Sequence, residues 1–195
     1  MRVRPRFAFP LAVALGLTLC ATAVRAQGTT AAPTKEEFTA FAVNLSRIGS
    51  TTPTPLDITI TRWTTVAEQE RLTSILREKG QPALVDALHK AQAIGSIRTP
   101  TSLSYEFRYA IQERTRDNRR RIILLTDRPI EYEELADRGV TLEYPFAAIE
   151  LLVDDNGKGA GSLWIAARLT LLDNLLILDN YADRPVTLNG VHRRK

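Results

Sequence analysis

Cysteine and histidine are scarce in this chain of 195 residues, which contains one cysteine, Cys20, and two histidines, His89 and His192. One cysteine cannot form an intramolecular disulfide, and we expect Cys20 to be removed with a leader segment. A zinc site without cysteine needs three or four other ligands, which two isolated histidines do not supply. We therefore predict no metal site, no cofactor and no disulfide, and we interpret His89 as a solvated helix residue.

The motifs of the common catalytic sites are also missing. No G-x-S-x-G nucleophile elbow occurs in the sequence, so we predict no serine hydrolase centre. The start of a calcium loop is suggested by Asp154-x-Asn156-x-Lys158. However, Lys158 stands where such a loop needs an oxygen donor, and Ile165 stands where it needs a glutamate. We predict a hairpin turn there and assign no catalytic residues.

The N-terminal segment has the pattern of a signal peptide. Three arginines precede an apolar run from Phe7 to Val24, and the small residue Ala26 follows. An uncleaved membrane anchor is the alternative, but the run is short for a span and Pro10 interrupts it. We predict a signal peptide over 1–26, a flexible lead-out over 27–35 and one domain over 36–195. The mature protein would then be exported, to the periplasm or the medium, without a transmembrane segment.

The basic charge of the whole chain comes from this leader. The formal net charge is +4 and the pI is about 9.5, but four arginines and no acidic residue lie within 1–26. The rest of the chain has equal numbers of basic and acidic residues. Global electrostatics therefore gives no reason to expect a nucleic-acid partner.

Apolar periodicity predicts a domain of many strands and two helices. Thr65 and Glu68 form the pattern of a capping box, and Gly80 is a stop signal before a second short helix that begins at Pro82. We expect a further helical turn over 129–139. The strands are expected over 38–45, where a short helix is the alternative, and over 57–63, 103–111, 121–127, 141–153, 163–169, 175–180 and 186–191. Four-residue apolar runs in two of them, 122–125 and 175–178, indicate strands covered on both faces. We predict an α+β fold: a mostly antiparallel, strongly curved sheet, sandwich-like or half-barrel, with a pair of helices packed on one face.

Strict alternation over 103–111 predicts one apolar face that carries Tyr105, Phe107 and Tyr109. These aromatic side chains, together with Trp63 and Trp164, could line a ligand cavity. We interpret them as core, because apolar strand faces usually pack.

Several short motifs resemble a family of uncharacterised exported bacterial proteins over Phe38 to Val191. The motifs are Ile60-Thr-Arg-Trp-Thr-Thr65, Ile97-Arg-Thr-Pro100, Thr126-Asp-Arg-Pro-Ile130, Tyr144-Pro-Phe146, Asn180-Tyr181 and Pro185-Val186. The resemblance implies an exported single domain. It implies no activity, cofactor or catalytic residue.

Five arginines surround one aspartate at the expected tip of a hairpin, in Arg114-Thr-Arg-Asp-Asn-Arg-Arg-Arg121. Guanidinium groups bind carboxylate and phosphate with paired donors, so Arg114, Arg116, Arg119 and Arg120 are the candidates for an anion-binding site. Charged hairpin tips are common, however, and the pattern by itself favours a solvated turn whose charges prevent edge-to-edge aggregation. The partner would be an acidic envelope component or protein.

Two function classes remain open on the sequence. We favour a non-catalytic exported binding or envelope-associated module. The alternative is a hydrolase that works through paired carboxylates, drawn from Glu131, Glu133, Glu134, Glu143 and Glu150.

Overall fold

The computed structural model describes residues 35–43, 53–100, 104–130, 144–172, 175–180 and 185–194, the side chains beyond 170 only over 185–194. Contacts divide the chain into Met1–Ala31 and Ala32–Lys195, and every described residue belongs to the second unit. The predicted signal peptide and the helical turn expected over 129–139 therefore lie outside the described residues, apart from Pro129 and Ile130.

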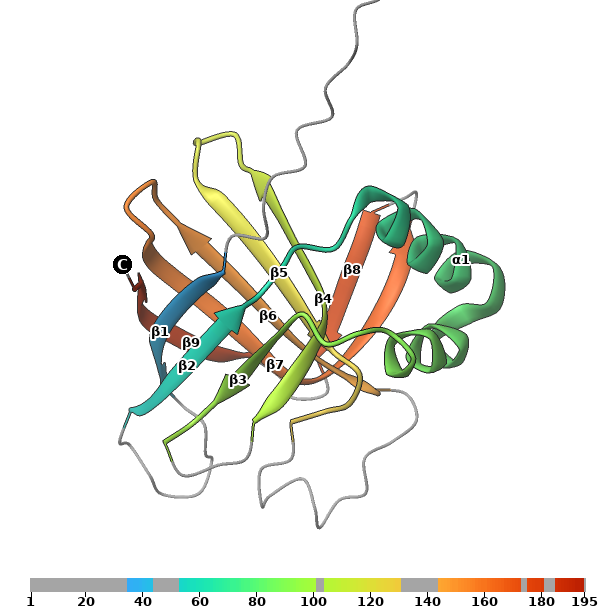
Figure 1. The fold of residues 1–195 in the computed structure, drawn as a ribbon, viewed down its shortest axis with the longest axis horizontal. Helices are drawn as coiled ribbons and strands as arrows, with labels where there is room; N and C mark the ends of the chain where they lie inside the picture. The colour runs from blue at the N-terminus through green and yellow to red at the C-terminus, as the bar shows by residue number, and fades with distance from the viewer. Residues whose placement is uncertain are drawn as a thin grey trace, which may run out of the picture. The chain divides into compact units, whose positions relative to one another are not determined.

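Eight antiparallel strands form a closed barrel (Figure 1). Going around the ring, each strand pairs with the next, and β9 pairs with both β7 and β1. The strands of the ring are β1 (Glu36–Val43), β2 (Thr54–Ile60), β3 (Gly95–Arg98), β4 (Tyr105–Arg114), β5 (Arg120–Thr126), β6 (Phe146–Val153), β7 (Lys158–Leu172) and β9 (Val186–Arg193).

The long strand β7 extends past the ring. Its first part pairs with β6 and β9, and its last residues pair with β8 (Leu175–Asn180). Strand β8 has β7 as its only strand partner among the described residues. The β7–β8 hairpin therefore projects from the ring between the neighbouring ring strands β7 and β9.

One helical element, α1 (Val66–His89), connects β2 to β3 and is kinked at Gly80. The predicted capping box is present: the Thr65 side chain accepts from the Glu68 backbone N–H, and the Glu68 carboxylate accepts from the Thr65 backbone N–H. Gly80 has φ +75°, a conformation that a residue with a Cβ adopts only under strain. The helix therefore breaks at Gly80 and turns back on itself in two arms (Figure 1).

Two hydrophobic clusters lie on opposite faces of the barrel wall. The inner cluster fills the barrel with side chains from all eight ring strands, among them Phe38, Ile58 and Phe107, which are almost fully buried. The outer cluster packs α1 against β5, β6 and β7 through Leu72, Leu84, Leu88, Ile123, Leu125, Phe146, Ala148, Ala167 and Leu169. The prediction that the apolar run 122–125 is covered on both faces is confirmed, because Ile122 and Leu124 face inward while Ile123 and Leu125 face α1.

The predicted single aromatic face of strand 103–111 is wrong beyond Phe107. A register shift lies between Phe107 and Tyr109 in the pairing of β4 with β5. One extra residue in a strand moves every later side chain to the other face. Tyr105 and Phe107 therefore pack with the inner cluster, whereas Tyr109 and Ile111 pack with the outer one.

The predicted α+β class is wrong, because the domain is mostly strand and its sheet closes into a barrel. Pairing of β6 with β7, and of β9 with β1, leaves no open edge in the ring, in contrast to a sandwich or a half-barrel. The predicted pair of helices is a single kinked element. Within the described part of the chain, no helix is long and apolar enough to cross a membrane.

Candidate functional site

The predicted arginine-rich tip is the β4–β5 hairpin, at the end of the barrel where β1 begins and β9 ends. A compact turn shapes it: the Thr115 N–H donates to the Arg119 carbonyl, and the Arg119 N–H donates to the Thr115 hydroxyl. Asn118 has φ 61°, which asparagine tolerates better than most residues. The sequence Thr115-Arg-Asp-Asn118 therefore makes a defined loop.

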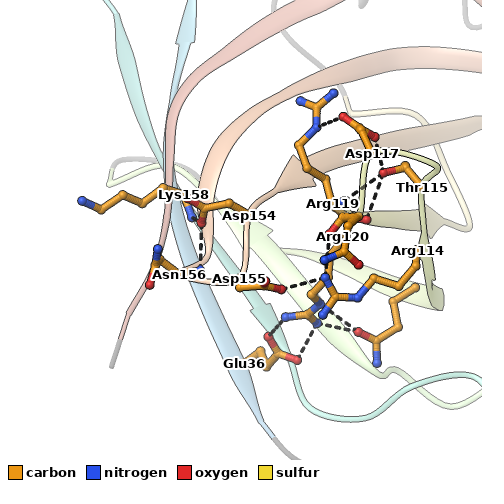
Figure 2. A network of polar contacts seen from close by, with 12 residues as sticks. Glu36, Arg114, Thr115, Asp117, Arg119, Arg120, Asp154, Asp155, Asn156 and Lys158 are labelled. Atoms are coloured by element: carbon orange, nitrogen blue, oxygen red, sulfur yellow. Dashed lines mark hydrogen bonds and ion pairs between the residues drawn. The ribbon is translucent and has the colours of Figure 1, made fainter.

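Two of the predicted site residues, Arg114 and Arg119, are oriented by carboxylates (Figure 2). Arg114 Nη1 donates to Asp155 Oδ1 and to the Asn118 carbonyl, each at 2.7 Å, and so ties the hairpin to the β6–β7 turn. Arg119 Nε pairs with Asp117, whose pKa is lowered by the Thr115 hydroxyl and then by Arg119. The side chains of Arg114 and Arg119 remain 52% and 47% exposed.

Arg120 does not project from the tip but lies inside the end of the barrel. Its side chain is 14% exposed, and its two terminal nitrogens bind the Glu36 carboxylate. It also donates to the Gln112 side-chain oxygen and stacks 5.9 Å from the centre of the Trp63 ring. The alternation of the strand could have predicted this inward position, because Arg120 lies two and four residues before the inward-facing Ile122 and Leu124.

The remaining two arginines of the run differ from each other. Arg121 lies on the outer face and binds both Glu150 and Glu113, and these hydrogen bonds raise its pKa. Arg116 is exposed at the tip, and among the described residues no side chain or backbone group pairs with its guanidinium. Arg116 is therefore the unpaired cation of the hairpin, and Arg114 and Arg119 flank it.

The β6–β7 turn beside this hairpin is stabilised by the side chain of its first residue, Asp154. Asp154 Oδ1 accepts from the backbone N–H groups of Asn156 and Lys158, both at 2.9 Å, and the Lys158 hydrogen bond is the main cause of a lowered Asp154 pKa. Gly157 has φ +75°. The prediction of a hairpin turn is confirmed. No group of three or more His, Cys, Asp or Glu side chains suited to a metal comes together among the described residues.

Sequence reasoning missed a second polar cluster, at the C-terminal end of α1. His89 Nδ1 lies 3.1 Å from Asp127 Oδ2, and Arg108 Nε donates to the same oxygen at 3.1 Å. Asp127 is largely buried, while His89 is half exposed. His89 is therefore anchored rather than merely solvated. The partners lie 38 residues apart in the sequence, and no local pattern connects them.

The candidate carboxylates of a hydrolase are only partly placed. Glu131, Glu133, Glu134 and Glu143 lie outside the described residues. Glu150 is on β6, where its carboxylate binds Arg121 Nε at 2.6 Å. The one described member of the set is thus engaged in an ion pair between neighbouring strands.

Comparison with known proteins adds no relative to this description. No family model, no curated protein and no solved structure matches the chain.

Proposed function

We propose that this chain is a non-catalytic exported binding module that contacts an acidic component of the cell envelope. The contact surface is the tip of the β4–β5 hairpin, with Arg116 at its centre and Arg114 and Arg119 beside it. Arg120 supports the hairpin from inside the barrel and is not part of this surface.

The observation that carries the proposal is the unpaired Arg116 between two oriented arginines. Arg119 donates to Asp117 through Nε alone. The N–H groups of its two terminal nitrogens therefore remain available to a ligand. Figure 2 draws no contact between these nitrogens and the other residues shown. Donors that are already held in place lose little side-chain entropy when they bind a carboxylate or phosphate.

The packed barrel favours a binding surface on the outside. Its interior is occupied by apolar side chains, including Phe38, Phe107 and Ile58. Glu150, the described candidate for the alternative hydrolase, is held by Arg121. Both observations support binding over carboxylate catalysis.

Retention of the purified protein on anionic phospholipid vesicles and on an acidic polysaccharide tests this proposal. The wild type should be retained at low salt and released as salt rises, because ions screen the attraction beyond about 8 Å at physiological ionic strength. The double variant Arg114→Ser/Arg116→Ser should lose this retention. Arg77→Ser/Arg98→Ser is the matched control, because it also removes two exposed arginines, one from α1 and one from β3.

The double variant removes one exposed ion pair, Arg114–Asp155, and no core side chain, so the barrel should remain folded. Equal thermal unfolding of variant and wild type would establish this. Equal and salt-insensitive retention of the wild type and the double variant would leave the arginines as a solvated turn and would overturn the proposal.

A further inference from the structure

The kink in α1 creates a groove between its two arms. The groove has a volume of about 310 Å³, and both arms line it: Arg71, Ile75 and Lys79 before the kink, and Ala83, Asp86, Ala87 and Lys90 after it. These positions repeat at helical spacing, four residues apart on the first arm and three or four apart on the second, so each set forms one stripe of its arm. This volume is at the lower end of the range for small-molecule sites.

The charges around the groove are not neutralised by the protein. Arg71, Lys79 and Lys90 are exposed, and none of them forms an ion pair or a side-chain hydrogen bond with a residue that the structure describes. Asp86 is the single carboxylate among the lining residues, and it too has no such partner. Three cations therefore face one anion, whereas most arginines of the β4–β5 hairpin are already paired with carboxylates.

The floor between these cations is apolar. Ile75, Ala83 and Ala87 are partly buried. The side chains of Ile75 and Ala87 also pack against the outer cluster. The small size of Ala83 and Ala87 leaves space opposite Ile75. A molecule that places a hydrocarbon body on this floor would bring its charged group within reach of the surrounding lysine and arginine side chains.

We propose that the α1 groove is a binding site for a small organic anion with an apolar body, of the class of a medium-chain monocarboxylate. The Ile75–Ala83–Ala87 floor takes the hydrocarbon part, and the cationic rim takes the carboxylate. Charge complementarity selects an anion over a neutral or cationic amphiphile. This site is separate from the hairpin surface, and it can be present whether or not that surface binds an acidic partner.

Titration of the purified protein with decanoate, followed by amide NMR shifts, tests the site. The expected shifts concentrate in Arg71–Lys90, and saturation requires both parts of the ligand. Acetate and decanol, which each supply one part, should bind at least about tenfold more weakly, because each lacks one of the two favourable contributions.

Two variants separate the two contributions. Arg71→Gln/Lys79→Gln removes the charge and should weaken decanoate binding about tenfold or more. Ala83→Leu fills the groove without a change of charge and should abolish binding, while equal thermal unfolding shows that the fold is kept. Arg116→Gln, a change of one charge on the hairpin, should leave decanoate binding unchanged.

Each other outcome contradicts the proposal. Equal affinity in wild type and Ala83→Leu would show that the ligand does not occupy the groove. Shifts confined to the β4–β5 hairpin and removed by Arg116→Gln would assign the anion to the hairpin surface instead. Binding to anionic vesicles that depends on Arg71 and Lys79 but not on Ala83 would indicate a membrane surface as the partner.

Discussion

Arg120 and Glu36 form a bidentate ion pair inside one end of the barrel. The Glu36 carboxylate accepts from the two terminal nitrogens of Arg120 at 3.0 and 2.9 Å, and its side chain is only 11% exposed. The pair joins β1 to β5 across 84 residues of sequence. Arg120 also stacks on the Trp63 ring and donates to Gln112, and the half-exposed Arg193 lies 3.6 Å from the same Glu36 carboxylate.

We expect Glu36→Ala to destabilise the protein by roughly 3 kcal/mol, because it leaves the buried Arg120 without its counter-charge. The double variant Glu36→Leu/Arg120→Leu should be closer to the wild type, since it removes both charges together. Urea unfolding measures both free energies. A double variant as unstable as Glu36→Ala would show that the buried charge is not the cause.

The acid stability of the helix start should depend on Glu68. Hydrogen bonds from Arg62, and further ones from Thr65, lower the pKa of Glu68 from 4.5 to about 2. The ionised carboxylate therefore contributes stability that is present above pH 4.5 and is lost as the pH falls towards 2.

Glu68→Gln provides the measurement for this prediction. The stability difference between wild type and variant should be largest at neutral pH and should shrink between pH 4.5 and 2. A difference that stays constant over this range would refute the role of the carboxylate charge.

The inner and outer faces of β4 should differ in their response to truncation. Phe107 is 1% exposed within the inner cluster, so Phe107→Ala should cost roughly 3–5 kcal/mol through lost burial and a cavity. Glu106 is exposed and pairs with Arg108, so Glu106→Ala should cost less than about 1 kcal/mol. Chemical denaturation of the two variants compares them, and equal losses would contradict the assignment of faces.

Export with cleavage after Ala26 is a further expectation. Edman sequencing or terminal mass spectrometry of the exported protein should find Gln27 as the first residue. Recovery of the intact leader in a membrane fraction would instead indicate an anchor.

Local patterns in the sequence were sufficient for most individual elements. The capping box at Thr65, the break at Gly80, the turn at Asp154 and the two-sided burial of 122–125 all depend on neighbours a few residues apart. Closure of the barrel was not predictable in this way, because it depends on the pairing of β9 with β1. These two strands are the last and the first of the ring in the sequence.

The candidate site shows the same division. The position of the arginine-rich tip could be predicted from the sequence. Whether each arginine is paired or exposed, however, depends on carboxylates far away in the sequence, such as Asp155, which binds Arg114 from 41 residues away. The α1 groove escaped prediction for a related reason. Arg71, Ile75 and Lys79 share one face by helical spacing, but only the fold-back at Gly80 places the second arm against them.

Hydrogen exchange of the protein with saturating anionic vesicles, and separately with acidic polysaccharide, is the most direct test of the proposed function. We expect slower exchange of the Thr115–Arg119 amides with at least one of these ligands at low salt, and a return to the free rate at high salt. Exchange at Thr115–Arg119 that stays unchanged with both ligands, or protection that occurs only elsewhere in the barrel, would contradict it.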